Sequence, residues 1–551
     1  MRLHRQIVVL LVAVCLLAVP LTSAPPPARP KLVVLLVVDQ MSSFYTENYR
    51  GQWKAGLARL LKEGAWFQEA AYPYANTVTC VGHATISTGS FPSTHGIVGN
   101  AWFDRQANKN MGCTEDPSTP LIGYQAPAKG GNSAWRLQVP TFSDELRAQT
   151  TPAPRVVTMS IKDRTAIVLA GRQADAATWL SASEKTWVTS TTYTSTPVPF
   201  VERFTKASPV EAELPETWNL TLPASAYAFT DEGIGEHPLS GWTKTFPHPL
   251  KVGTTGSFAA WDESPFSDAY LGRMAEAAVD EYQLGRGAGI DLLAISFTAL
   301  DLVGHDFGPR SFEVQDLLVR LDQTIGRLLA HLDERVGKDN YVVALSADHG
   351  VAPIPEQVKE AGEDAGRVLA VDVLRATEKS LATSLGTGTS AGRFSGTDIY
   401  LPPATLERLT ADRPAIDAML EAIRRVPGVA EAFWTPGLPG ARQASDPIKR
   451  AAALNFFPGR TGDVMVIPKP NWSFTGSQPT MGGGGTTHGT PAAYDQRVPV
   501  VLMGAGIKPG QYKRAVTPAD VTPTLAVLCG ITMPRADGRR LAEALVTAPP
   551  K

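Results

Sequence analysis

The chain has 551 residues, of which 43% are hydrophobic and 19% are charged, with 51 Lys and Arg against 53 Asp and Glu. This composition excludes a mini-protein scaffold, a disordered chain and a fibrous protein, and it fits either one large α/β domain with insertions or two to three domains. The formal net charge of -2 provides no basic field for a nucleic-acid backbone, so we expect no nucleic-acid binding.

The N-terminus predicts an export signal. Two arginines precede the apolar run IVVLLVAVCLLAV, and a proline and small residues follow it. This run is shorter than the about 20 residues that a membrane span needs, which favours a secretory signal peptide at residues 1–24. We therefore expect a periplasmic or secreted mature protein, residues 25–551, with no membrane span. Lipidation at Cys15 is the alternative, disfavoured by the bulky valine before it.

Residues 31–39 read KLVVLLVVD and predict a strand buried on both faces, as in a parallel sheet. Asp39 lies at the carboxyl end of this strand. Open parallel sheets bind their ligands outside the carboxyl ends of the strands, so Asp39 is a candidate site residue.

A candidate nucleophile follows in the segment NTVTCVGHATISTGSFPSTHGIVGN. Thr79 precedes a small-residue run that predicts a helix, and the N-terminus of a helix favours an alkoxide and a phosphoryl group. The plainer alternative for Thr79 is an N-cap, and Thr77 is a rival nucleophile. Cys80 lacks the C-x-P-x-R signature of a sulfatase. We assign His83 and His95 to packing or hydrogen bonding.

The segment MSIKDR supplies two cations, Lys162 and Arg164. If this segment is extended, the spacing of two residues directs both side chains into one pocket. A pair of surface cations is the alternative.

A strand, helix, strand unit comes next. DLLAISFTALD predicts a strand ending at Asp301, the apolar spacing of residues 313–337 predicts an amphipathic helix, and NYVVALSADH predicts a strand ending at Asp348 and His349. Asp301 and His305 are four residues apart, so both reach one cation if this segment turns helically. A surface Asp and His pair is the alternative.

Two segments interrupt the sheet pattern. Residues from about 170 to 265 lack sustained helical period and predict a cap or lid, and residues from about 355 to 485 predict a smaller α/β insertion. The pattern resumes with a strand in residues 498–507 and a helix at 520–530. We therefore expect an α/β fold with a mostly parallel central sheet and helices on both faces.

His488 lies in the glycine-rich run MGGGGTTHGT, which is either a flexible turn or a loop that returns an imidazole to the site. The candidate ligands are then three carboxylates and three imidazoles: Asp39, Asp301, His305, Asp348, His349 and His488. This mixture of oxygen and nitrogen suits zinc better than Mg²⁺ or Ca²⁺. We expect two zinc sites, each with about three protein ligands and an open position.

Beyond the predicted signal, the cysteines are Cys80, Cys113 and Cys529. An odd number cannot all pair, although one bridge can form in an oxidising compartment. The sequence leaves the pairing open.

In this order, the motifs resemble the alkaline phosphatase superfamily, and within it the phosphate-irrepressible alkaline phosphatases of the PafA type. The similar segments are VVDQM, NTVTCVGH with TGS and HGIVGN, IKDR, ALDLVGHDFG, SADHG, the late THG and DVTPTLAVLCGI. They span the whole mature chain, so the resemblance implies an alkaline phosphatase-like catalytic domain over residues 25–551.

The resemblance also implies residue roles. Thr79 is then the nucleophile, and the phosphate contacts are Asn100, Lys162 and Arg164. One zinc is then held by Asp301, His305 and His488. The second is held by Asp39, Asp348 and His349, joined by Thr79.

We therefore expect an exported zinc-dependent alkaline phosphatase that hydrolyses phosphate monoesters through a phosphothreonine intermediate. Two zinc ions, three carboxylates and an alkoxide sum to about zero, and Lys162 and Arg164 add about +2, which matches a dianionic monoester better than a monoanionic diester. One alternative is a nucleotide pyrophosphatase or phosphodiesterase of the same superfamily; another is a secreted, metal-stabilised binding protein without catalysis. The oligomeric state stays open, with a monomer favoured.

Overall fold

The computed structural model describes residues 29–546 apart from 182, 252 and 476–484. The predicted signal peptide at residues 1–24, with Cys15, lies outside the described residues. Within them the largest element is an 11-stranded mixed sheet. Its strands are, in spatial order, β21 (Gly510–Tyr512), β2 (Ala65–Phe67), β20 (Val500–Gly504), β13 (Tyr341–Ser346), β1 (Leu32–Val38), β12 (Asp291–Phe297), β7 (Val156–Ser160), β8 (Ala176–Ser181), β9 (Thr186–Ser190), β5 (Glu115–Gly123) and β6 (Gly131–Asn132).

The centre of this sheet is parallel. Strands β13, β1, β12, β7 and β8 run in the same direction, and β20 and β9 flank them antiparallel. The predicted α/β class with a central sheet is confirmed. The strand predicted within residues 498–507 is β20, and it runs against its neighbour β13 because the chain returns to the sheet from the other end.

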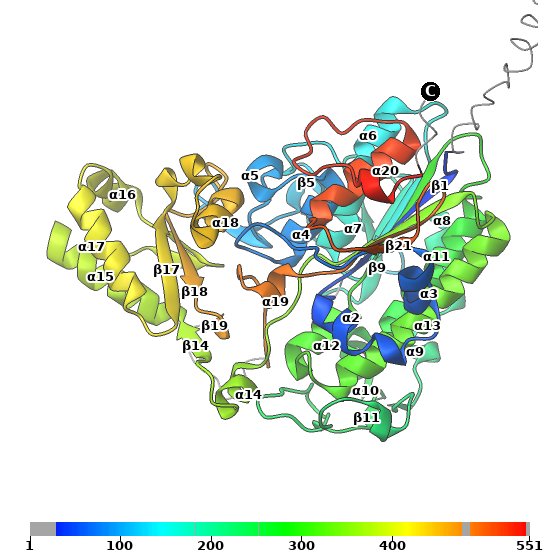
Figure 1. Cartoon of the computed structure of the whole chain (residues 1–551), viewed down its shortest axis with the longest axis horizontal. Coiled ribbons are helices and arrows are strands. Elements are labelled where there is room, and N and C mark those ends of the chain that lie inside the picture. Colours follow the sequence, from blue (N-terminus) through cyan, green and yellow to red (C-terminus); the bar gives the residue numbers. More distant parts are fainter. Residues whose placement is uncertain (1–28, 182, 252, 476–484, 547–551) are drawn as a thin grey trace, which may run out of the picture.

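Alternate side chains of β1 enter two hydrophobic cores, one on each face of the sheet. Leu32, Val34 and Leu36 belong to one core, and Val33 and Leu35 belong to the other. This alternation follows from the two-residue period of a strand. The first face is covered by α3 (Gly56–Glu63), α11 (Pro265–Glu281) and α13 (Phe312–Arg335), and the second by α6 (Phe142–Gln149) and α20 (Val521–Cys529) (Figure 1).

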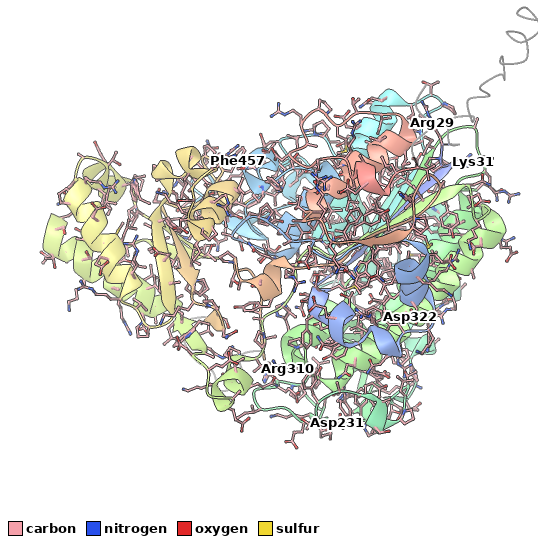
Figure 2. All side chains as sticks on the ribbon, in the orientation of Figure 1. Arg29, Lys31, Asp231, Arg310, Asp322 and Phe457 are labelled. Atoms are coloured by element: carbon pink, nitrogen blue, oxygen red, sulfur yellow. A yellow bond between two sulfur atoms is a disulfide. The ribbon has the colours of Figure 1, made fainter. Side chains whose placement is uncertain are left out.

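A polar side chain also links two of these helices, α13 and α3. Asp322 on α13, labelled in Figure 2, accepts hydrogen bonds of 2.7 Å from the backbone N–H groups of Lys54 and Ala55. These groups precede α3, which has no side-chain cap of its own. A buried carboxylate from a neighbouring helix therefore accepts hydrogen bonds from the free backbone N–H groups at the start of α3.

The predicted cap at about 170–265 begins within the central sheet. Strands β8 and β9 lie inside this range, so the part outside the sheet is shorter than predicted and follows Ser190. Strands this short carry no helical period, and this explains why the sequence pattern did not separate them from the cap. That part holds α8 (Pro199–Ala207), α9 (Val210–Glu213), the pair β10 (Thr217–Trp218) and β11 (His248–Pro249), and α10 (Gly253–Asp262).

A second, smaller body lies within the range 355–485, at the left of Figure 1. Its strands β15 (Arg393–Ser395), β16 (Asp398–Tyr400), β18 (Val464–Pro468) and β17 (Val429–Trp434) form a sheet in that order. Helices α15 (Ala370–Leu385), α16 (Pro403–Thr410) and α17 (Arg413–Arg424) share its separate hydrophobic core. The domain limits given from the sequence stay a prediction.

The other α-helices and strands complete the fold within the described residues. They are α2 (Ser43–Asn48), α4 (Thr79–Thr88), α5 (Pro92–His95), the hairpin β3 (Ala101–Asp104) and β4 (Lys109–Gly112), α7 (Asp163–Ala170), α12 (Ala299–Phe307), α14 (Pro355–Glu360), the pair β14 (Gly366–Leu369) and β19 (Trp472–Thr475), α18 (Pro447–Asn455) and α19 (Ala493–Gln496). Among the described helices, none has both the length and the apolar character that a membrane span requires.

Candidate functional site

Three neighbouring strands bring the first ligand candidates to one edge of the sheet. β1 pairs in parallel with β13 on one side and β12 on the other. Asp39 directly follows β1, and Asp348 and His349 follow β13 after one intervening residue. Asp301 lies in the first turn of α12 rather than at a strand end, because the chain turns helical directly after β12.

Asp39, Asp348 and His349 form a fully buried group. His349 Nε2 lies 3.3 Å from Asp39 Oδ1 and 3.4 Å from Asp348 Oδ2. Neither of these carboxylate oxygens has a hydrogen-bond partner among the described residues. Buried carboxylate oxygens that accept no hydrogen bond are costly, and a cation placed between them removes that cost. The geometry of the group suits a metal ion.

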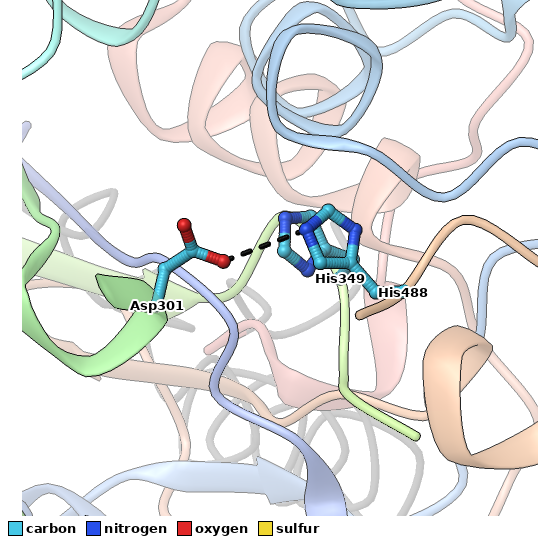
Figure 3. Close-up of side chains that lie close together, drawn as sticks. All are labelled: Asp301, His349 and His488. Carbon is cyan, nitrogen blue, oxygen red and sulfur yellow. Dashed lines mark ion pairs between the residues drawn. The ribbon is translucent and has the colours of Figure 1, made fainter. Parts of the chain in front are cut away.

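Asp301 is the centre of a second group. Its Oδ1 lies 3.3 Å from His305 Nε2 and 3.5 Å from His488 Nε2. In Figure 3 the Asp301 carboxylate points toward His488 and His349, whose stacked rings have centroids 3.5 Å apart. Asp301, His349 and His488 also place ligand atoms close enough for one ion, so His349 lies between the two groups.

The three imidazoles share one orientation. In His305, His349 and His488, Nδ1 lies 2.9 Å from a backbone carbonyl oxygen. A carbonyl oxygen only accepts, so Nδ1 carries a hydrogen in each ring and Nε2 is the atom that faces the carboxylates. Histidines that bind a metal through Nε2 are commonly held in this way. The donor set therefore fits a metal such as zinc.

Thr79 is the first residue of α4 and is only 1% exposed. Its Oγ1 lies 3.5 Å from His349 Nε2. Helix α4 comes this close because residue 82 is glycine: a Cβ at Gly82 would lie 2.0 Å from the backbone oxygen of Asp348. The rival hydroxyl of Thr77 donates to a backbone carbonyl at 2.9 Å and is engaged there. Thr79 is thus the hydroxyl that faces the ligand candidates.

Asn100 precedes the hairpin of β3 and β4. Its Oδ1 accepts a hydrogen bond of 2.8 Å from the N–H of Cys80, and its backbone carbonyl accepts one of 2.9 Å from the N–H of Cys113. Cys80 and Cys113 form a disulfide, whereas Cys529 is free and buried. Because α4 holds the side-chain oxygen, the amide nitrogen of Asn100 is the end left to donate to a substrate.

Lys162 lies between the two carboxylate groups. Its Nζ is 2.7 Å from Asp39 Oδ2 and 2.5 Å from Asp301 Oδ2. The condition that the whole segment is extended is not met, because Lys162 immediately precedes α7 and Arg164 lies in the first turn of that helix. Both cations nevertheless line one cavity of about 490 Å³. Arg164 Nε is buried and has no hydrogen-bond partner among the described residues.

Burial and the close carboxylates shift the pKa values of the cluster in opposite directions. Burial, and then repulsion from Asp39, raises the pKa of Asp348 well above its ordinary range. Burial also acts to raise the pKa of Asp39, but Lys162 and His349 outweigh it and hold that pKa below its ordinary value. The pKa of Lys162 is raised, because the carboxylates outweigh its burial, so this ammonium stays charged.

Sequence reasoning missed some polar residues at the site. Gln40, next to Asp39, bonds to both ligand groups, and its place in the VVDQM segment was the available signal. Asp268 on α11 accepts hydrogen bonds from two backbone N–H groups at the start of α12, and no spacing links it to that helix. His83, assigned to hydrogen bonding, has Nδ1 3.2 Å from Asp348 Oδ2 and Nε2 2.8 Å from a serine hydroxyl.

The family comparison agrees with this geometry. The model of the type I phosphodiesterase / nucleotide pyrophosphatase family matches residues 33–491. The chain therefore belongs to this family, which is part of the alkaline phosphatase superfamily.

Two curated relatives and one solved structure are similar along nearly their whole length. The chain is 32% identical to a calcium-transporting ATPase of Myroides odoratus, over 94% of this chain and 95% of the relative. It is 31% identical to alkaline phosphatase PafA of Elizabethkingia meningoseptica, over 95% of this chain and 96% of the relative. The crystal structure of wild-type PafA superposes with a TM-score of 0.85 and 29% identity, covering 94% of this chain and 99% of that one.

Proposed function

We propose that this protein is an exported, zinc-dependent alkaline phosphatase that hydrolyses phosphate monoesters through a phosphothreonine intermediate at Thr79. One observation carries the proposal: a threonine at a helix N-terminus faces two adjoining groups of carboxylates and imidazoles, with Lys162 between them. Similarity to alkaline phosphatase PafA supports the class of phosphoric monoester hydrolases.

The donor set supports two zinc ions. One would be held by Asp39, Asp348 and His349 with Thr79, and the other by Asp301, His305 and His488. The buried oxygens without partners and the common orientation of the imidazoles support this assignment. When bound, zinc would supply Lewis-acid stabilisation of negative charge on the attacking and departing oxygens.

Thr79 would act in two in-line steps. In the first, a bond forms between its Oγ and phosphorus while the bond from phosphorus to the departing alkoxide breaks. The Thr79 hydroxyl gives its proton to water, and the alkoxide takes a proton from water. In the second, water attacks the phosphothreonine, inorganic phosphate leaves and the hydroxyl is restored. The N-terminus of α4 favours negative charge at this oxygen. Two inversions give net retention of configuration at phosphorus.

Asn100, Lys162 and Arg164 would bind the phosphoryl oxygens. Lys162 and Arg164 supply two positive charges, and Asn100 presents its amide nitrogen because its oxygen is held by α4. A dianionic monoester offers more charge to these groups than a monoanionic diester does, so the pair favours monoesters. The family description also includes phosphodiesterases, which keeps a diester substrate as the alternative.

Two features support export to the periplasm or outside the cell. The sequence of residues 1–24 has the pattern of a secretory signal peptide. The disulfide between Cys80 and Cys113 is typical of proteins that mature in an oxidising compartment.

Phosphate release tests the proposal directly. An aryl phosphate monoester and the matching diester are compared at equal concentration, before and after EDTA and after zinc is added back. We expect faster monoester hydrolysis that EDTA abolishes and zinc restores. Faster diester hydrolysis would instead identify a phosphodiesterase. Loss of thermal stability in EDTA, with no zinc-restorable hydrolysis, would indicate a metal-stabilised binding protein.

A further inference from the structure

Gln40 occupies a turn that few side chains adopt. It follows β1 with a φ of 67°, in the left-handed region, and it is fully buried. A residue other than glycine in this region costs free energy, so the turn persists only where surrounding contacts hold it. At Gln40 those contacts lead to both groups of candidate metal ligands.

The backbone of Gln40 holds the first group. Its N–H donates to Asp348 Oδ1 at 3.0 Å, and the N–H of His349 donates to the same oxygen at 3.0 Å. Asp348 Oδ2 is left as the oxygen that faces the imidazole of His349. The left-handed turn thereby selects which oxygen of Asp348 points toward the candidate metal position.

The side chain of Gln40 holds the second group. Its Nε2 donates to Asp301 Oδ1 at 2.7 Å and lies 3.3 Å from the backbone oxygen of the same residue. Asp301 Oδ1 is also the oxygen nearest to His305 and His488. A carboxylate oxygen has two lone pairs, so it can accept this N–H and still bind a cation. Because the amide is neutral, it fixes Asp301 without competing with that cation.

Helix α12 leaves room for this side chain at a single glycine. A Cβ built on Gly304 would lie 1.9 Å from Gln40 Oε1 and 3.0 Å from the carbon of the same amide. Gly304 lies between Asp301 and His305 on α12. The amide of Gln40 therefore rests on the helix backbone between two candidate ligands.

We propose that Gln40 is a positioning residue that couples the two metal groups: its turn aims Asp348 and its side chain aims Asp301. This inference rests on the proposed function for the identity of the metal, but not for the contacts themselves. Removal of the side chain should weaken the zinc site that contains Asp301 more than the site that contains Asp348, because the hydrogen bond from the backbone of Gln40 to Asp348 survives the change.

Zinc binding provides the test in the full-length protein. The metal-stripped protein is titrated with zinc against a chromophoric chelator, and bound zinc is counted by elemental analysis. Gln40→Gly keeps the left-handed turn and removes the amide, and Gln40→Glu keeps the size and replaces the donor with a charge. We expect each variant to weaken one of the two zinc affinities by at least about 10-fold. Wild-type affinity at both sites in Gln40→Gly would overturn the proposal.

Gln283 supplies the matched control. It is also a glutamine at positive φ, 50°, but it is exposed and lies beyond the end of α11. Gln283→Gly and Gln283→Glu should leave both zinc affinities unchanged. Thermal unfolding of the metal-stripped proteins separates positioning from folding: if Gln40→Gly and Gln40→Glu lose zinc only in proportion to lost stability, the proposal fails.

A double-mutant cycle tests the contact with Gly304. Gly304→Ala alone should weaken zinc binding by at least about 10-fold, because the new methyl group displaces the amide of Gln40. In the Gln40→Gly background the same change should cost less than about 3-fold, since nothing is left to displace. Additive losses would contradict the coupling. Zinc titration needs no turnover, so a wild-type protein that binds zinc but hydrolyses no monoester would refute the proposed function alone.

Discussion

The disulfide between Cys80 and Cys113 joins the residue after the candidate nucleophile to the end of the hairpin of β3 and β4, which directly follows Asn100. The same two cysteines donate backbone hydrogen bonds to the side chain and the main chain of Asn100. The disulfide therefore holds the N-terminus of α4 close to Asn100, the candidate phosphate contact. Sequence separation across the bridge is 33 residues.

Removal of this disulfide should affect both the stability of the protein and substrate binding. Cys113→Ser removes the bridge but keeps the backbone N–H that bonds to Asn100. We expect a loss of about 2 to 4 kcal/mol in the free energy of unfolding, because the loop between the two cysteines is no longer constrained in the unfolded chain. We also expect about a 10-fold lower kcat/KM, because Asn100 is held less tightly against α4.

The measurements are thermal unfolding and monoester hydrolysis, with and without a reducing agent. Cys529→Ala is the control, because Cys529 is not in the bridge and reduction should affect that variant as it affects the wild type. If reduction leaves both the stability and the kcat/KM of the wild type unchanged, the disulfide does not hold Asn100 in place.

Thr79→Ala tests the nucleophile. Without the hydroxyl no phosphothreonine can form, so we expect kcat/KM for monoesters to fall by at least about 1000-fold. Thr79→Ser, which keeps a hydroxyl, should retain more activity. Mass spectrometry of acid-quenched enzyme should detect added phosphate in the wild type and none in Thr79→Ala.

Thr77→Ala is the matched control for that experiment. Its hydroxyl is engaged by the backbone carbonyl of Thr490, and its contact with His488 is made by the backbone oxygen, which the substitution keeps, so the change should cost about 1 kcal/mol of stability and little turnover. Retained phosphorylation in Thr79→Ala together with its loss in Thr77→Ala would reverse the assignment.

The sequence was sufficient to predict where the candidate ligands that follow strands lie in the fold. Asp39, Asp348 and His349 lie at one sheet edge because uninterrupted apolar runs encode buried parallel strands, whose ends coincide. The helical position of Asp301 entered the sequence analysis only as a condition, under which Asp301 and His305 would reach one cation. The turn at Gln40 could not be predicted, because its φ is set by contacts with residues far along the chain.

Tertiary pairings account for the other differences. Which cysteines pair depends on where a hairpin folds against α4, and spacing alone does not give this. Asp268 satisfies the start of α12 from a separate helix, as a local N-cap would, but without a local signature. Strands β8 and β9 were included in a cap because such short strands give only a weak periodic pattern in the sequence.

We expect the substrate preference to depend on the positive charges of Lys162 and Arg164. The double variant Lys162→Ala with Arg164→Ala should lower kcat/KM for a monoester by at least about 100-fold and for a diester by about 10-fold, since the diester carries less charge. Arg375→Ala with Lys379→Ala, on the exposed face of α15, controls for net charge. Equal losses for the two substrates would show that the pair does not select monoesters.

The smaller body should have its own pH dependence, caused by Asp398. Burial raises the pKa of this carboxyl to about 7, although the N–H of Gly462 donates to it. The folded state then keeps a proton that the unfolded chain releases near the ordinary value of 3.8. Stability from this group is therefore complete below about pH 4, falls as the pH rises toward 7, and stays low above it.

Asp398→Asn removes this titration and should stabilise the smaller body by about 1 to 3 kcal/mol at pH 8, with little effect at pH 4. Amide hydrogen exchange in β16 and β18, compared between variant and wild type at each pH, measures the difference. Asp417→Asn, on the exposed face of α17, is the control and should show no such dependence. A variant that is less stable than the wild type at pH 8 would mean that the hydrogen bond from Gly462 to the ionised carboxylate outweighs the cost of burying it, so that the pKa of Asp398 is not raised.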